Sequence, residues 1–187
     1  MSSSDKNEVS APPESAGGKG TVQMSEEERK AFQQFNATLS RMVGDVVRMM
    51  SMHSAYCHMF MSDIQWLVVP PLLAHQFKMM VTHNEEVLGC VIWAEVTDRV
   101  RDRIKKGSWA LQPNEWRGGP NAIVMLVLAP PGSNLEAGFV QEVKKQHFAQ
   151  RRLELVSWAR GNKAELVEVE AAARQEKPEE SDDASKS

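Results

Sequence analysis

VLGCVIWAEVT, residues Val87–Thr97, is the stretch that decides the fold of this chain. It is an almost unbroken run of apolar and β-branched residues, which predicts a strand buried on both faces. Thr97 or Asp98 can cap a charged helix that runs to about Lys106. The next apolar run, AIVMLVLA at Ala122–Ala129, predicts a second buried strand, which Pro130-Pro131-Gly132 ends in a sharp turn. Two buried strands joined through a helix indicate the centre of a sheet.

The segments on either side extend this sheet. HQFKMMVT, residues His75–Thr82, is followed by a polar turn and predicts a hairpin with Val87–Thr97. Ser133 or Asn134 can cap a helix over about Leu135–Gln150, a strand is expected at Leu153–Trp158, and a short charged helix at Lys163–Arg174. The fold class is therefore α/β or α+β, with a central mixed sheet flanked by helices.

The N-terminal part of the folded region predicts a long helix. Ser25 with Glu28 three residues later forms a capping box. Apolar residues then recur at three- and four-residue spacing and predict one core-facing side: Phe32, Phe35, Leu39, Met42, Val43, Val46 and Met50. Residues 51–63 have no clear period and predict a loop or a short helix. Pro70-Pro71 is expected to end the element formed by the apolar run Asp63–Val69.

Composition excludes several classes of protein. The chain has 187 residues, 42% of them hydrophobic, and a net charge of -3, which argues against a general nucleic-acid binder. No apolar run approaches the roughly 20 residues of a membrane span, and the N-terminus lacks the apolar core of a secretory signal. Two cysteines do not make a disulfide framework, so a cytoplasmic protein is expected. We expect disordered tails at 1–24 and 175–187 and one domain at 25–174.

The segment His53-Ser54-Ala55-Tyr56-Cys57-His58 gathers the side chains best suited to chemistry. Histidine is the natural general base near neutral pH, and an irregular connector is a common place for a site. His75, His83 and His147 lie in ordinary positions. Cys57 could be a nucleophile activated by a histidine, but a buried, inert thiol is the stronger expectation. No metal-ligand spacing and no glycine-rich nucleotide loop is present, so no metal or cofactor is expected.

From Met42 to about Trp158 the chain resembles the toxin-activating lysine-acyltransferases of the hemolysin-activating type. The matching words are DIQWLVVPPLLAHQF at Asp63–Phe77, GCVIWAEVTDRVRDRI at Gly89–Ile104, LQPNEWRGG at Leu111–Gly119 and VLAPPG at Val127–Gly132. The resemblance implies a fold like that of the acetyltransferase superfamily. It also implies a cytoplasmic enzyme that takes a fatty acyl group from acyl carrier protein. The resemblance further implies that the enzyme can form a homodimer. The acceptor would be an internal lysine of an RTX-type protoxin.

The resemblance also locates the active site, and there this sequence departs from the family pattern. The family's histidine falls at Tyr56, the serine that precedes it at His53, and the aspartate at Leu126. One interpretation is a shifted base, with His58 preferred over His53 and Tyr56 beside it; Asp63 and Asp98 are the nearest carboxylates in sequence. A second is a degenerate member that binds carrier protein or toxin without acyl transfer. A third is a soluble cytoplasmic α/β domain whose function lies elsewhere.

Overall fold

A computed structural model describes residues 24–159 and 163–170 of the chain. The tail predicted for 1–24, apart from Met24, and the tail predicted for 175–187 lie outside these residues. The chain divides into two compact units, residues 1–35 and 36–187. The second unit holds the sheet and everything described below except the start of the first helix.

The first helix, α1 (Glu26–Met52), begins as predicted. Glu28 N–H donates to Ser25 Oγ at 3.2 Å and Ser25 N–H donates to Glu28 Oε2 at 2.8 Å, which confirms the capping box. These bonds hold the pKa of Glu28 below its usual value. Val46 and Met50 are buried, as the apolar spacing predicts, whereas Phe32 and Phe35 are about half exposed. Core packing is thus confirmed for the second half of α1 and is wrong for Phe32 and Phe35.

Two short helices follow, α2 (Met61–Leu67) and α3 (Val69–Leu73). The expectation that an element ends at Pro70-Pro71 is confirmed, because α2 ends at Leu67. The sequence did not predict that both prolines lie in the first turn of a new helix, α3. The first turn of a helix tolerates proline because an N–H group there would have no partner within the helix. The double proline therefore starts a helix that leads into the sheet.

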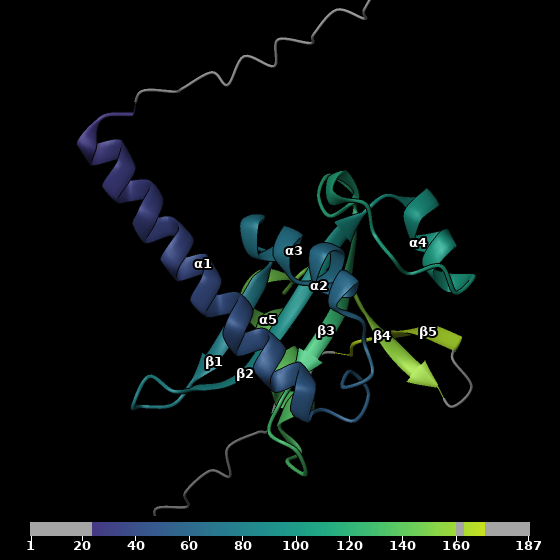
Figure 1. Cartoon of the computed structure of the whole chain (residues 1–187). Coiled ribbons are helices and arrows are strands. Elements are labelled where there is room, and N and C mark those ends of the chain that lie inside the picture. Colours follow the sequence, from purple (N-terminus) through teal and green to yellow (C-terminus); the bar gives the residue numbers. More distant parts are fainter. Residues whose placement is uncertain (1–23, 160–162, 171–187) are drawn as a thin grey trace, which may run out of the picture. The chain divides into compact units, whose positions relative to one another are not determined.

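Within the described residues the sheet has five strands, in the order β1-β2-β3-β4-β5 (Figure 1). The strands are β1 (Phe77–Val81), β2 (Val87–Val96), β3 (Asn121–Leu128), β4 (Leu153–Ala159) and β5 (Lys163–Glu168). Only β3 and β4 run parallel, and the crossover between them is helix α5 (Leu135–His147). The predicted mixed sheet flanked by helices is confirmed, and it is consistent with an acetyltransferase-like fold.

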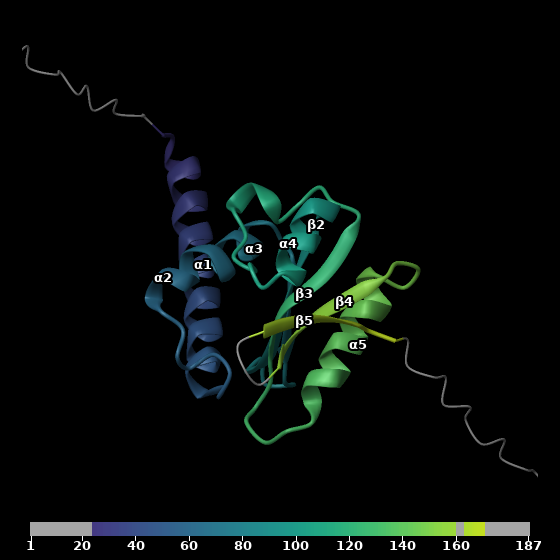
Figure 2. The same ribbon diagram turned by 90° about the vertical axis from the view of Figure 1, so that its right-hand side faces the viewer.

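Each face of the sheet packs against its own set of helices. Cys90, Ile92 and Ala94 of β2 belong to a core that includes residues of α1, α2, α3 and the helix α4 (Asp98–Lys105). Val91 and Trp93, which alternate with them, belong to a second core that includes residues of α5. Figure 2 shows α5 across the sheet from α2 and α3. The prediction that the strand at Val87–Thr97 is buried on both faces is confirmed.

The prediction of a helix at Lys163–Arg174 is wrong for the residues of this segment that the structure describes, because Lys163–Glu168 forms the edge strand β5. It pairs antiparallel with β4 along its whole length. β4 has a partner on its other side only near its start, so pairing with β5 satisfies backbone groups that a helix would leave open. The pairing also brings Leu166 against one core and Val169 against the other.

The parallel strands β3 and β4 form a fork. They pair at Ala122–Val124 and Leu153–Leu155, and within the described residues the pairing stops there although both strands continue. Figure 1 shows the two arrows turning away from each other. The register of β2 with β3 also shifts beside Met125, a β-bulge that increases local bending. The fork opens a gap in the sheet between the two cores.

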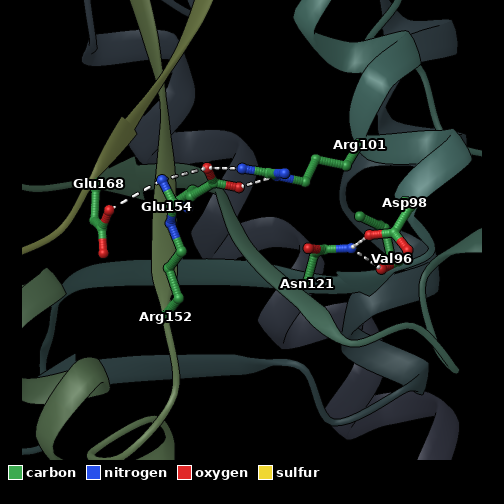
Figure 3. A network of polar contacts seen from close by, with 7 residues as sticks. All are labelled: Val96, Asp98, Arg101, Asn121, Arg152, Glu154 and Glu168. Atoms are coloured by element: carbon green, nitrogen blue, oxygen red, sulfur yellow. Dashed lines mark hydrogen bonds and ion pairs between the residues drawn. The ribbon is translucent and has the colours of Figure 1, made fainter.

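A polar network holds the closed end of the fork (Figure 3). Glu154 of β4 is 3% exposed and accepts two hydrogen bonds from Arg101 of α4, at 2.5 and 2.6 Å. Arg152 bridges Glu154 at 3.5 Å and Glu168 of β5 at 2.9 Å. Asn121 Nδ2 of β3 donates to Asp98 and to the Val96 carbonyl. Helix α4 and strands β3 to β5 are thereby joined where the fork begins.

Candidate functional site

A cavity of about 490 Å³ lies at the open end of the fork. Its lining comes from β3, β4, β5, α5 and the connector between α1 and α2. Its aliphatic lining consists of eight side chains: Ala55, Val127, Ala137, Val140, Leu155, Val156, Val167 and Val169. Val127 and Val156 belong to different cores, so the cavity reaches through the gap in the sheet. An elongated apolar group can be buried there at a gain of about 0.8 kcal/mol per methylene.

One edge of this cavity is polar and carries a histidine paired with a carboxylate. His53 Nε2 lies 2.9 Å from Glu136 Oε1, although the two residues are 83 positions apart in sequence. The ring of Tyr56, which is buried, packs 4.8 Å from the His53 ring. The side chains of His53 and Glu136 are 19% and 52% exposed, so the carboxylate is the more open of the two.

Successive turns of the connector aim His53 and Tyr56 at the cavity. The backbone N–H groups of Tyr56 and Cys57 donate to the His53 carbonyl at 3.0 and 2.9 Å. This helical spacing places residues three apart on one side and turns His58 to the other. His58 is exposed and does not line the cavity. Of the three site residues predicted from the sequence, the structure thus brings His53 and Tyr56 together and leaves His58 apart.

The two carboxylates that the sequence suggested, those of Asp63 and Asp98, are hydrogen-bonded to other groups. Asp63 accepts from the Phe60 N–H and from Trp66 Nε1, at 2.9 and 3.0 Å. Asp98 accepts from Asn121 Nδ2 at 2.9 Å. Leu126, where the resemblance of the sequence places the family's aspartate, is fully buried in the core that α1 to α4 cover. The carboxylate that pairs with His53 at the cavity comes from Glu136 instead, in the first turn of α5.

Sequence reasoning missed Glu136, although a signal for it existed. In a β-α-β crossover the first turn of the helix follows the carboxyl end of the preceding strand, where ligands commonly bind. Glu136 has this position after β3 and the turn Pro130–Asn134. Its pairing with His53 depends on how the connector folds against α5, which the local sequence does not show.

Neither cysteine belongs to the cavity lining. Cys57 is exposed, so the expectation that it is buried is wrong, and its Sγ donates to the Ser54 carbonyl at 3.6 Å. Cys90 is fully buried in the middle of β2, and burial raises the pKa of its thiol to about 12. A cavity without a thiol favours direct attack by a substrate nucleophile over a covalent cysteine intermediate.

A larger hollow of about 790 Å³ lies beside α4 and has a different character. Its charged lining includes Arg103 and Glu115, which are bonded to each other at 2.6 and 2.8 Å. We place the candidate site in the smaller cavity, where an apolar pocket meets a histidine–carboxylate pair.

Among the residues that the structure describes, no group of three or more His, Cys, Asp or Glu residues is arranged to hold a metal ion. Across residues 24–159 and 163–170, none of the helices is both long and apolar enough to cross a membrane.

Comparison with known proteins adds two findings. The model of the RTX toxin acyltransferase family matches residues 35–171, which include the fork, α5 and the connector. A lysine-acyltransferase of Vibrio cholerae serotype O1, RtxC, is 25% identical over 127 residues, covering 67% of this chain and 80% of that protein.

Proposed function

This chain belongs to the RTX toxin acyltransferase family, and on that premise we propose that it transfers a fatty acyl group from acyl carrier protein to a lysine of an RTX-type protoxin, in the cytoplasm. The observation that carries this proposal is the cavity in the fork. It joins an apolar pocket to a polar edge with His53, Tyr56 and Glu136. Binding of a fatty chain requires the apolar pocket, and proton transfer from an amine requires the polar edge.

The reaction converts a thioester and an amine into an amide and a thiol. The ε-amine of the acceptor lysine attacks the thioester carbonyl, and one proton has to leave the nitrogen. With the acyl chain among the valines of the cavity, its carbonyl would lie toward the edge that holds His53 and Glu136. Holding both reactants at one edge supplies much of the rate by proximity.

A second candidate function keeps the binding and omits the chemistry. It is favoured by Leu126, a fully buried aliphatic residue where the family has an aspartate. In this case the protein would bind acylated carrier protein or protoxin without turnover. The two candidates differ in a single measurement, the appearance of acyl-lysine.

The test mixes the purified protein with fatty-acylated carrier protein and an RTX-type protoxin. We expect acyl-lysine on the RTX protein by mass spectrometry, with release of free carrier-protein thiol in equal amount. Binding of the acylated carrier protein without either product would favour the second candidate.

His53 and His58 make a matched pair of variants for this assay. We expect His53→Ala to lower kcat about tenfold to a hundredfold, because it removes the group that fixes the polar edge. His58→Ala should stay within about twofold of the wild type, because its side chain is exposed outside the cavity. The opposite ranking would place the base at His58, as expected from the sequence.

A further inference from the structure

We propose that Glu136 takes the proton from the attacking amine and that His53 is the residue that positions Glu136. This inference rests on the acyl transfer proposed above. It reverses the roles that a histidine beside a carboxylate would suggest, since the carboxylate is the proton acceptor.

The hydrogen bonds of His53 determine which of its ring nitrogens carries the proton. The backbone N–H of Ala55 donates to His53 Nδ1 at 3.2 Å, so Nδ1 is the acceptor nitrogen. A neutral imidazole has one donor and one acceptor nitrogen, so the proton is on Nε2. Nε2–H then donates to Glu136 Oε1 at 2.9 Å. Both ring nitrogens are engaged, and the ring has no free lone pair for a substrate proton.

Glu136 keeps the acceptor capacity that His53 lacks. An ionised carboxylate has about four lone-pair sites on two oxygens. The described residues provide Glu136 with one bond, to Oε1 from His53, and leave Oε2 open. Its side chain is 52% exposed, against 19% for His53, so a lysine entering from solvent meets the carboxylate first.

The charge around the cavity favours a cationic side chain. Glu136, Glu168 and Glu170 all line it. Among the described residues, Glu168 has a cationic partner, Arg152, whereas the contacts of Glu136 come from the neutral His53 ring. A lysine ammonium is drawn to such an edge before it loses its proton.

Every proton in the proposed reaction is accounted for by the substrates, Glu136 and solvent. The lysine ammonium releases one proton to solvent, and the neutral amine attacks the thioester carbonyl to form the C–N bond. Glu136 Oε2 takes the second proton from nitrogen as the tetrahedral adduct collapses. The C–S bond breaks, and the proton passes from Glu136 to the departing thiolate. The products are the amide, the carrier-protein thiol and an ionised Glu136.

The decisive variant is Glu136→Gln. Its amide oxygen can still accept from His53 Nε2–H, but the side chain cannot take up a proton. We expect kcat to fall at least about a hundredfold, with KM for the acylated carrier protein within about twofold. Glu142→Gln is the matched control, because Glu142 lies on the same helix outside the cavity and contacts Lys78; it should match the wild type.

A chemical-rescue assay separates proton transfer from structure. Glu136→Ala should regain activity in proportion to added formate or acetate, whereas Glu142→Ala should not respond to either anion. A loss of activity in Glu136→Ala without rescue would mean that Glu136 only shapes the cavity, and would overturn the assignment.

The positioning role of His53 has its own readout. If His53 acts through Glu136, the double variant His53→Ala/Glu136→Gln should be no slower than Glu136→Gln alone. If the two residues acted independently, the rate losses of the two single variants would multiply. Glu136→Gln with more than half of the wild-type rate refutes the inference while the proposed function stands. A wild-type protein without transfer activity refutes the proposed function and the inference with it.

Discussion

Gly119→Ala should destabilise the protein by about 3 kcal/mol or more. A Cβ at Gly119 would lie 1.8 Å from the Val96 carbonyl carbon and 2.2 Å from the Thr97 nitrogen. Both are backbone atoms at the end of β2, so no side chain can rotate aside. Gly119 N–H also donates to the Glu95 carbonyl at 2.9 Å, which holds the turn against the strand. The variant must displace β2 or lose this turn.

The measurement is thermal or urea unfolding followed by circular dichroism. For a chain of this size the melting temperature should fall by about 6–12 °C for 3 kcal/mol. Gly138→Ala is the control: Gly138 lies within α5 with nothing within 4 Å of a Cβ, and alanine there should raise stability by about 0.5–1 kcal/mol. A Gly119→Ala protein that melts with the wild type would show that the close approach is absent in solution.

Glu154→Gln should lower the free energy of unfolding by about 3 kcal/mol, the low end of the range for breaking a buried ion pair. The change keeps the size of the side chain and removes its charge from Arg101, which is 19% exposed. Arg152→Gln is the matched control, because Arg152 is 58% exposed and its pairs should contribute no more than about 1 kcal/mol.

The effect of Glu154→Gln should depend on pH in a defined direction. Hydrogen bonds from Arg101 hold the pKa of Glu154 below its usual value. A lowered folded pKa stabilises the protein above the unfolded pKa of about 4.3, and that contribution is lost as the pH falls through the folded value. The difference in stability between wild type and variant should therefore be full at neutral pH and shrink in acid. A difference that stays constant down to pH 3 would contradict the ion-pair explanation.

The sequence predicted the elements that are long, apolar and bounded by clear caps. Three such local features are the strand at Val87–Val96, the strand at Asn121–Leu128 and the helix cap at Thr97. The Thr97 side chain accepts a hydrogen bond from the Val100 N–H. For Lys163–Glu168 the sequence predicts a helix, whereas the structure has a strand, because this short, charged segment has little period of its own. Its structure comes from pairing with β4, a contact between neighbours in the sheet that local propensity does not determine.

The candidate site was predictable only by region. The sequence singles out the connector from His53 to His58, and the structure places His53 and Tyr56 of this connector at the cavity. Which histidine faces inward depends on its turn geometry, and the partner carboxylate lies 83 residues away on α5. The resemblance, which places the family's aspartate at Leu126, predicts the loss of one carboxylate but not that helix α5 supplies a different one.

The two thiols offer an internal probe of how the sheet opens. Cys57 is exposed, whereas Cys90 lies at the centre of β2 with its thiolate strongly disfavoured by burial. Only thiolates react with alkylating reagents, so modification of Cys90 has to wait for the strand to separate from its neighbours. Its labelling rate, read against the immediate reaction of Cys57, therefore reports the free energy of opening around the fork without any introduced dye or mutation.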